Sequence, residues 1–376
     1  MTNDKEGFLV PQIDEALCTG CKVCVDRCPE NNNSVPFAQE NKLPKVFGVK
    51  LKNDAVLKMS ASGGVFSGIA LKILESSGNA VFGCAFDENI VAKHICITNA
   101  KYLEPIQSSK YVQSDTGNTF SQAKHLLDSG KTVFYTGCPC QIAGLYAYLD
   151  KDYDNLLTAE LICHGVPSPL LFKKYILWLE KKYGEKVHYY NFRTKDKHGW
   201  GLMTKVMTKS KTKFIDPNAD PYFNSFLENK TFRECCYTCK YATQKRVGDI
   251  TLGDFWGVKK FHPEFYDQRG ISIVLINSDK GERFFRDVYN DFDIVVSSME
   301  KAVTTQHNLK SPSHRHSLRG DVYKDINNDS VDIFASAELR PSKKKLIKVY
   351  LKQGIKLITP RFVLKLYKKC KAQIFR

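Results

Sequence analysis

Four cysteines near the N-terminus have the spacing of an iron–sulfur ligand set. Cys18, Cys21, Cys24 and Cys28 follow C-x2-C-x2-C-x3-C, and Pro29 comes directly after the last of them. In this pattern the first three thiolates hold one [4Fe–4S] cluster, and the fourth serves a second cluster where two are present. Paired C-x2-C sequences also bind zinc. The third closely spaced cysteine and the Cys-Pro ending favour iron and sulfur here.

A second set of cysteines is dispersed along the chain. Cys140 follows a Cys-Pro pair, Cys163 precedes His164, and Cys236 and Cys239 form a C-x2-C pair. Each lies in an expected loop beside a strand, where functional side chains are often carried. Taken singly, each is as well explained as a small buried apolar residue, and the pair could also bind zinc. The spacing alone leaves open whether they meet.

Three further stretches carry candidate binding residues. Ser62-Gly63-Gly64 precede an expected helix, where glycines let backbone N–H groups approach a phosphate. Small residues also begin many helices for packing reasons, so both interpretations stay open. Arg193 is a candidate partner for an anion, and Asp254 begins an Asp-Phe-Trp run that could line a ring pocket. Taken alone, a solvated charge cluster and a core aromatic pair are commoner.

The elements that must position these residues alternate between strand and helix. Strands alternating with helices predict a mixed α/β body. The expected order is a glycine-rich turn and helix over 60–78, two strands over 79–98, helix, strand, tight turn and helix over 121–149, a strand and Cys-His-Gly loop over 155–169, strands over 187–193 and 201–216, and a buried strand with a helix over 270–289.

Composition excludes several classes of protein. The chain has 376 residues, is 43% hydrophobic and contains no run of about 20 apolar residues that could span a membrane. The N-terminus lacks the plan of a signal peptide, so we expect a cytoplasmic protein. Thirteen cysteines, an odd number, favour metal ligation or redox chemistry over a disulfide framework.

The positive charge is concentrated at the C-terminus. Residues 340–376 contain thirteen Lys or Arg and no acidic residue, which leaves +3 of the net +16 for the other 339 residues. We therefore expect no nucleic-acid-binding surface on the body. Apolar residues interleave with the tail lysines at helical spacing, Leu346, Tyr350 and Leu351 before Pro360 and Phe362, Val363, Leu366 and Tyr367 after it. This pattern predicts a basic amphipathic tail at the inner membrane face, or packed on protein.

The order of short motifs resembles a known family. Over roughly residues 6–300 the chain is similar to the beta subunit of coenzyme F-420 hydrogenase and its relatives. These include F-420H2 dehydrogenases, the flavoprotein half of a deazaflavin-dependent sulfite reductase, 7-hydroxymethyl chlorophyll a reductase, and bacterial members encoded with polysaccharide-synthesis genes. The motifs are ASGGVFS, SSKYVQSD, GCPCQIAGL, LICHGVPSP, NFR followed by GW, C-x2-C-K and DITLGDFWG.

The resemblance implies FAD with a [4Fe–4S] cluster beside it. It implies that Cys140, Cys163, Cys236 and Cys239 hold that cluster, and it leaves out Cys138, where the family more often has threonine, and the extra Cys235. His164 becomes a candidate proton donor, with a structural histidine about equally expected. The residues implied for the flavin pocket are Ser62, Gly63, Gly64, Lys110, Tyr111, Gln141, Arg193 and Asp254.

Many relatives carry two ferredoxin motifs separated by a GF-x-x-P-x-I-D sequence. This chain opens with EGFLVPQID at residues 6–14, so it resembles a member that begins after the first motif. The run that ends at Cys28 would then close its own cluster, borrow a ligand, or stay empty, and the number of clusters is one or two.

The sequence thus predicts an iron–sulfur flavoprotein oxidoreductase. Its body is expected to be mixed α/β, with divisions at 1–47 (ferredoxin-type module), 48–130 and 131–335 (flavoprotein domain) and 336–376 (basic tail). Electrons would pass between a hydride carrier, either a deazaflavin such as coenzyme F-420 or a nicotinamide, and a redox partner such as a ferredoxin or a hydrogenase subunit. The competing hypothesis is a non-enzymatic, zinc-stabilised scaffold for membrane-associated polysaccharide enzymes.

Overall fold

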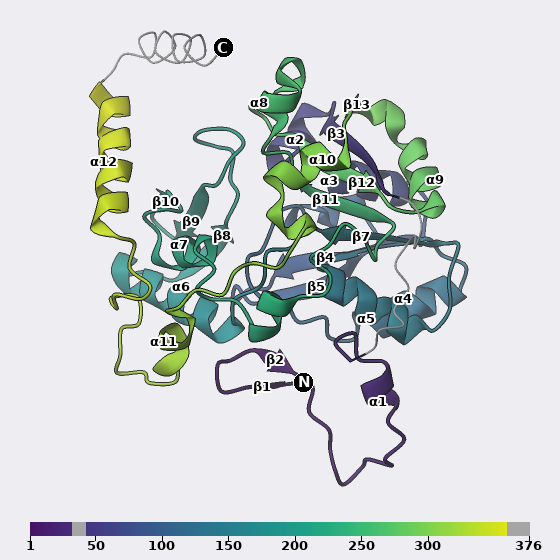
Figure 1. Cartoon of the computed structure of the whole chain (residues 1–376), viewed down its shortest axis with the longest axis horizontal. Coiled ribbons are helices and arrows are strands. Elements are labelled where there is room, and N and C mark those ends of the chain that lie inside the picture. Colours follow the sequence, from purple (N-terminus) through teal and green to yellow (C-terminus); the bar gives the residue numbers. More distant parts are fainter. Residues whose placement is uncertain (32–42, 359–376) are drawn as a thin grey trace.

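The centre of the computed structural model, which describes residues 1–31 and 43–358, is a mixed eight-stranded sheet (Figure 1). Its strands lie in the order β13 (Phe292–Val296), β3 (Lys45–Leu51), β12 (Ser272–Ile276), β11 (Ile250–Asp254), β7 (Leu156–Leu161), β6 (Val133–Gly137), β4 (Ala80–Phe86) and β5 (Ala92–Ile97). The four strands β11, β7, β6 and β4 are mutually parallel, and the others pair antiparallel at the two sides. The carboxyl ends of the parallel strands therefore share one edge.

Helices cover both faces of this sheet because its central strands are apolar on both sides. In β6, Phe134 faces α3 (Val65–Ile73) and α9 (Asp279–Asp287), whereas its neighbours Val133 and Tyr135 face α4 (Thr119–Asp128) and α5 (Pro139–Leu149). This two-residue alternation is the pleat of a strand. Shorter helices α2 (Asp54–Met59), α8 (Val258–Phe261) and α10 (Met299–Thr305) lie around the antiparallel side.

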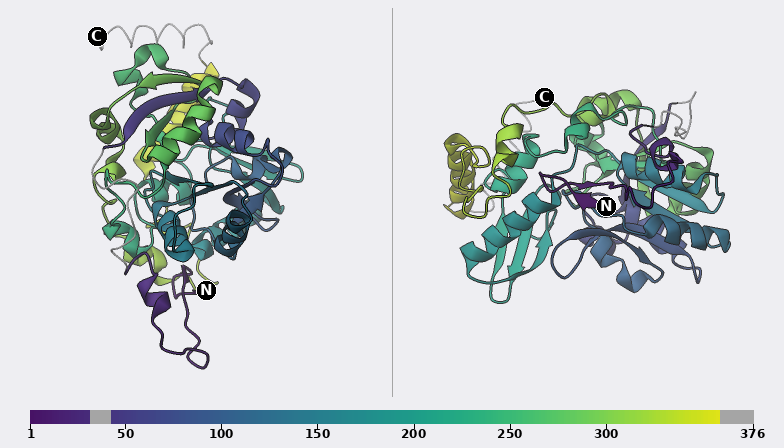
Figure 2. Two further views of the ribbon diagram at one scale, coloured as in Figure 1. Left: turned by 90° about the vertical axis from the view of Figure 1, so that its right-hand side faces the viewer. Right: turned by 90° about the horizontal axis from the view of Figure 1, so that it is seen from below.

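A smaller antiparallel sheet lies beside the large one, drawn in teal in Figures 1 and 2. It consists of β8 (Val187–Asn191), β9 (Thr204–Thr208) and β10 (Thr212–Ile215). The stretch 201–216, which was expected to be strand, forms the β9–β10 hairpin. Helices α6 (Pro169–Tyr183), α7 (Pro221–Leu227) and α11 (Arg319–Lys324) share with this sheet a core rich in aromatic side chains.

The helix α6 shows how sequence sets these boundaries. The Ser168 hydroxyl accepts hydrogen bonds from the backbone N–H groups of Leu170 and Leu171, and Pro169 occupies the first helical position. Both are favoured there because the first N–H groups of a helix have no partner within it. The helix ends at Gly184, whose φ of 72° is readily adopted by glycine.

The N-terminal segment forms a short hairpin, β1 (Thr2–Asn3) with β2 (Leu9–Val10), and the small helix α1 (Val23–Asp26). The hairpin packs on the body, whereas the chain that follows it projects from the molecule (Figure 2, left). The chain returns to the body at Arg27, which forms an ion pair with Asp150 at the end of α5. The residues of the cysteine run thus extend from a firmly attached base.

The C-terminal tail begins with α12 (Lys343–Ile358) (Figure 1). Val349 is buried, and Lys345 pairs with Glu228 beside α7, so one face of this helix packs on protein. Ile347, Tyr350 and Leu351 are more than half exposed. The second helix expected after Pro360 lies outside the described residues. Within the described part of the chain, no helix has the length and apolar character needed to cross a membrane.

Six short 3-10 segments complete the described part of the chain. They are η1 (Ala100–Tyr102), η2 (Glu104–Ile106), η3 (Glu234–Thr238), η4 (Pro263–Phe265), η5 (Tyr289–Asp291) and η6 (His307–Leu309). Of these, η3 matters most for function because it carries Cys235 and Cys236 and ends beside Cys239.

Candidate metal and cofactor centre

The chemistry-bearing residues gather at the carboxyl edge of the parallel strands. Cys138 follows β6, Cys163 lies two residues beyond β7, and Asp254 is the last residue of β11. Neighbouring parallel strands bring these ends together, although 116 residues separate the first from the last. Ligands of open α/β sheets bind at this edge.

The segment containing η3 is attached to the same edge. The backbone N–H of Arg233 donates to the carbonyl of Val166 at 2.9 Å, and Pro167 bridges to Phe232. These bonds hold the chain before η3 against the chain that follows Cys163. Backbone pairing thus brings together two segments that are far apart in the sequence, and the spacing of the cysteines could not show this pairing.

The predicted cluster ligands lie within electrostatic reach of one another. Desolvation by the surrounding segments raises the pKa of Cys140 well above its usual value, and the thiols of Cys163 and Cys239 raise it further. The pKa of Cys239 is raised to about 11, mainly by burial and also by Cys163. The pKa of Cys236 is raised chiefly by its hydrogen bond with Cys235, and also by burial and by Cys163. The four predicted ligands therefore form an electrostatically interacting group, in which Cys163 raises the pKa of the other three. Among the described residues, no three His, Cys, Asp or Glu side chains are arranged to hold a single metal ion.

Two thiols that the resemblance leaves out also lie in this group. The Sγ atoms of Cys138 and Cys163 are 3.7 Å apart. Cys235 hydrogen-bonds Cys236, and this contact lowers the pKa of Cys235 to about 7. The thiol group therefore contains six cysteines from three segments. A Cys-Pro pair directly after a strand was the available signal for Cys138.

The N-terminal cysteine run approaches the thiol group through Tyr241. The Tyr241 hydroxyl donates to the carbonyl of Pro29 at 2.9 Å, and its ring lies near Cys28 as well as Cys140 and Cys239. Burial, followed by the nearby Cys140, raises the Tyr241 pKa. The two cysteine sets thus flank one tyrosine, which sequence analysis did not single out.

The three N-terminal cysteines have a different environment. Cys18, Cys21 and Cys24 are exposed, and Cys28 is half-buried. The fourth cysteine of the run is therefore its least exposed member, and the first three are accessible to another protein.

Arg193 and Asp254 form a buried pair rather than a free anion site. Arg193 is 3% exposed and makes a bidentate bond with Asp254, both at 2.8 Å. Burial alone would raise the pKa of Asp254, but the guanidinium outweighs it and the pKa is lowered. The remaining donors of Arg193 go to the Tyr111 hydroxyl and to the carbonyls of Ala61 and Gly201.

All five N–H groups of Arg193 are consequently engaged, so its expected role as an anion partner does not fit. Two indole rings lie beside the Arg193–Asp254 pair and form one wall with it. Trp200 donates to Asp254 and stacks on Trp256, with ring centroids 5.0 Å apart, and Trp256 is 43% exposed. The Asp-Phe-Trp run therefore does border an aromatic surface.

Among the described residues, two half-buried lysines beside this wall hydrogen-bond to backbone carbonyls and not to carboxylates. Lys195 donates to the carbonyls of Leu57 and Ser62, both at 2.7 Å. Lys110 donates to the carbonyls of Pro105 and Ser108. Desolvation lowers the pKa of Lys195 to about 7 and that of Lys110 to about 8. Desolvated amines of this kind favour an anionic ligand. Lys195, two residues after Arg193, was missed in the sequence.

The Ser62-Gly63-Gly64 stretch does precede a helix, α3, but the backbone packing accounts for Gly63. A Cβ atom there would lie 2.2 Å from the Val49 carbonyl oxygen and 2.4 Å from the Ser272 nitrogen. Gly64 has a φ of 78°. The glycines therefore let α3 begin directly against β3 and β12, which is the packing interpretation of this motif.

Gln141 connects the thiol group to the Lys110 side of the edge. Its Oε1 accepts from the Cys138 N–H at 2.9 Å, and its Nε2 donates to the Ser114 hydroxyl at 3.0 Å. Ser114 also bonds His94, whose pKa falls to about 4 because it is buried. Gln141 thus fixes the turn carrying Cys138 and Cys140.

His164 lies between the thiol group and the Arg193–Asp254 pair. Desolvation lowers the pKa of its imidazole, although the nearby Asp254 carboxylate acts in the opposite direction and raises it. Its side chain nevertheless keeps contact with solvent, and its carbonyl accepts from Ser313 at 2.7 Å. A neutral, accessible imidazole at this place can accept or return a proton.

Comparisons with known proteins give two family matches and a similar solved structure. Residues 130–302 match the family model for the C terminus of the coenzyme F420 hydrogenase/dehydrogenase beta subunit, and residues 11–32 match the 4Fe-4S binding domain. No curated protein matches the chain. Among solved structures, the chain is similar to one from the F420-reducing [NiFe] hydrogenase complex of Methanosarcina barkeri, at 16% identity, 71% coverage of this chain, 89% of that chain and a TM-score of 0.48.

The two family matches support electron transfer through iron and sulfur, with a [4Fe–4S] cluster in the N-terminal segment. The matched residues 130–302 include Cys140, Cys163, Cys236 and Cys239, so this part of the chain is similar to the C terminus of the coenzyme F420 hydrogenase/dehydrogenase beta subunit.

Proposed function

We propose that this protein is an iron–sulfur flavoprotein that moves electrons between a hydride-carrying small molecule and [4Fe–4S] clusters. The observation that carries the proposal is the gathering of six thiols at the carboxyl edge of the sheet, flanked by the N-terminal cysteine run. Thiolate-rich sites select soft iron–sulfur clusters. The hydride carrier is a deazaflavin such as coenzyme F-420 or a nicotinamide.

The donor set fits a cluster at the body site. Cys140, Cys163, Cys236 and Cys239 would hold it, since the Cys163 thiol is close enough to disfavour ionisation of the other three. That repulsion is relieved when the thiolates ligate iron. The bonds of Gln141 to Cys138 and of Arg233 to Val166 hold the ligand-bearing segments in place.

The neighbouring wall fits FAD. Lys195 and Lys110 are desolvated amines that, within the described part of the chain, hydrogen-bond only to backbone carbonyls. They would hold the pyrophosphate, and the exposed Trp256 would border the rings. When bound, this cofactor supplies the exchange between two-electron hydride transfer and single-electron transfer. The Arg193–Asp254 pair keeps the wall rigid, and the imidazole of His164 holds or releases a proton at its edge.

The contacts of Tyr241 support a route for electrons between the body site and the N-terminal cysteine run. Tyr241 touches the backbone at Pro29 and adjoins Cys239, so the body site and the N-terminal run are neighbours. Cys18, Cys21 and Cys24 are exposed on the projecting segment. A redox protein such as a ferredoxin or a hydrogenase subunit would therefore exchange electrons at the N-terminal cluster.

Purification without oxygen tests the proposal directly. We expect a brown protein with iron, acid-labile sulfide and one FAD per chain, and an electron paramagnetic resonance signal after reduction. About four irons per chain would mean one filled cluster and about eight would mean two. A colourless, folded protein that contains zinc would instead support the scaffold hypothesis.

FAD affinity should fall as the pH rises above about 7. Because the Lys195 pKa is about 7, the amine loses its proton at higher pH. It must then take up a proton before it can pair with an anionic phosphate, which weakens binding. The K195M variant should bind FAD about tenfold more weakly at pH 7, as expected for a lost charged hydrogen bond, and show a shallower pH dependence. Equilibrium dialysis between pH 6.5 and 9.5 measures both, with exposed Lys58 of α2, changed to Met, as the control. A pH profile unchanged in K195M contradicts this role.

The exposed apolar face of α12 should bind anionic membranes. Ile347, Tyr350 and Leu351 lie three and four residues apart and are 58%, 63% and 60% exposed, while Lys344 and Lys348 flank them. Changing the three to serine should reduce binding to phosphatidylserine vesicles about tenfold at low salt. Leu177 of α6, 53% exposed, provides the matched control when changed to Ser. If vesicles bind the wild-type protein and the triple variant equally, this face is not a membrane contact.

A further inference from the structure

Cys138 has a contact that the proposed ligand set leaves unexplained. Its Sγ lies 3.7 Å from the Sγ of Cys163, which is far beyond the ~2.05 Å of a disulfide bond. Cysteine sulfurs on different irons of one cube are about 6 to 7 Å apart, given Fe–S bonds similar to the ~2.3 Å of Zn–S bonds. Cys138 and Cys163 therefore cannot both be ordinary ligands of the same [4Fe–4S] cluster in this arrangement.

The chemistry of the pair decides which sulfur carries the proton. A cysteine that ligates iron does so as a thiolate and has no proton to donate. If Cys163 is the ligand, the shared hydrogen belongs to Cys138, and the contact is an S–H···S hydrogen bond to the metal-bound sulfur. The distance of 3.7 Å is compatible with a hydrogen bond between two sulfur atoms, which are larger than oxygen.

The backbone fixes Cys138 in this position. It is the N-cap residue of α5, its N–H donates to Gln141 Oε1 at 2.9 Å, and Pro139 follows with its restricted φ. The side chain is half-buried beside the end of β7. A donor held in this way is directed at Cys163 before any cluster binds.

We propose that Cys138 is a positioning residue whose thiol donates a hydrogen bond to Cys163 and raises the reduction potential of the body cluster. The inference rests on the proposed function, because it requires Cys163 to be a ligand. Hydrogen bonds to cluster sulfurs stabilise the added negative charge of the reduced state. Cys138 thus acts through Cys163 and does not touch iron.

Redox titration of the anaerobically purified full chain tests this role. In C138A we expect unchanged iron and sulfide content, and one cluster transition displaced to lower potential. A tenfold loss in the reduction equilibrium would appear as ~59 mV for one electron. C138S keeps a donor at the same position and should restore much of the potential. C96A, which removes a partly buried thiol in β5 away from this edge, is the control and should change nothing.

Each outcome decides between specific alternatives. Loss of about four irons in C138A would show that Cys138 is itself a ligand and would overturn the inference. An unchanged potential in C138A would overturn it as well, because a purely structural thiol has no effect on the couple. If the wild-type protein carries a cluster that C163A retains, the ligand assignment of the proposed function fails instead, independently of Cys138.

Discussion

C163A should lose about four irons per chain relative to the wild-type protein, because a [4Fe–4S] cluster has four irons and this residue is one of its proposed ligands. Cys163 follows β7 and is the thiol that influences Cys140, Cys236 and Cys239 alike. Its removal leaves the body site without its central thiolate. Iron and sulfide assays on protein prepared without oxygen measure the loss.

Two matched variants separate the body cluster from the N-terminal one. C24A changes an exposed cysteine of the N-terminal run and should remove the other set of about four irons, where that set is filled. C96A should retain all the iron, since Cys96 packs against α4 and the large sheet rather than at the edge. Full iron content in C163A, with a normal electron paramagnetic resonance signal, would contradict the ligand assignment.

The architecture was largely readable from the sequence. Strand–helix alternation predicted the mixed α/β body, and the hairpin over 79–98 has its turn where Asp87 accepts bonds from Asn89 and Val91. The stretch 201–216, expected to be strand, forms the two strands β9 and β10, and the chain reverses at Lys209 and Ser210 between them. Alternation of side chains alone does not reveal a polar turn inside a run of strand-forming residues.

The candidate site could be predicted only in part from the sequence, because its residues are brought together by the pairing of segments that are distant in the chain. Arg193 and Asp254 were both expected in the pocket, but the sequence could not show that they would satisfy each other across 61 residues. Cys138 was left out because the family pattern has threonine there, and its distance from Cys163 appears only in three dimensions. Lys195 was missed because desolvation, which lowers its pKa to about 7, is not visible in a single lysine.

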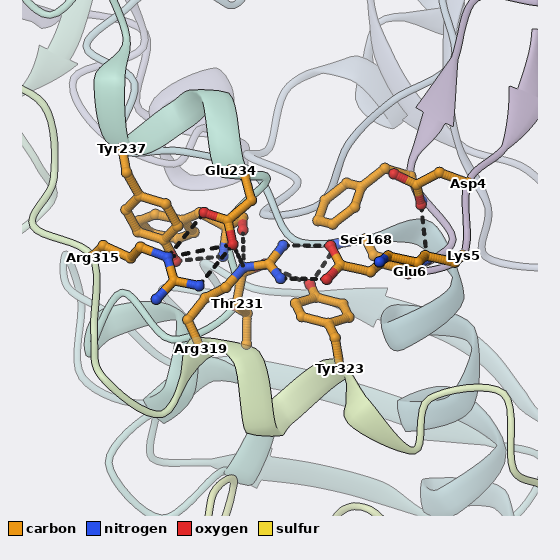
Figure 3. Close-up of polar contacts among 12 residues, drawn as sticks. Asp4, Lys5, Glu6, Ser168, Thr231, Glu234, Tyr237, Arg315, Arg319 and Tyr323 are labelled. Carbon is orange, nitrogen blue, oxygen red and sulfur yellow. Dashed lines mark hydrogen bonds and ion pairs between the residues drawn. The ribbon is translucent and has the colours of Figure 1, made fainter.

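A polar cluster joins the N-terminal segment, the η3 cysteine loop and helix α11 (Figure 3). Arg319 is 1% exposed and forms a bidentate bond with Glu6, at 2.6 and 2.7 Å. Its Nε donates to the carbonyl of Phe232, and Glu234 lies 3.3 Å away. Glu234 is the residue directly before Cys235. One guanidinium therefore holds the base of the N-terminal segment against the cysteine loop.

Neighbouring contacts make this attachment specific. The Ser168 hydroxyl donates to the Glu6 carbonyl at 2.6 Å, and Phe8 is buried against Tyr323, with ring centroids 5.5 Å apart. Gly7 has a φ of 78°, and a Cβ there would lie 2.2 Å from Leu170. The Glu-Gly-Phe sequence near the N-terminus is thus an attachment point to the body in this chain.

Accordingly, R319M should destabilise the protein by about 3 kcal/mol, because it leaves the largely buried Glu6 carboxylate unpaired. It should also expose the N-terminal segment to limited proteolysis and weaken iron retention at the body site, since the η3 loop loses its support. Thermal unfolding and the rate of cleavage within residues 1–31 measure these effects.

R315M provides the matched control. Arg315 pairs with the same Glu234 at 2.8 Å, but its side chain is 45% exposed, so its loss should cost less than about 1 kcal/mol. E6Q keeps the shape of the Glu6 partner and removes its charge. If R319M depends on the pair, E6Q and R319M should couple in a double-mutant cycle, whereas E6Q and R315M should be additive. Equal destabilisation by R319M and R315M would show that burial of the guanidinium is not what holds the N-terminal segment, and that its attachment depends on the apolar contact of Phe8 with Tyr323.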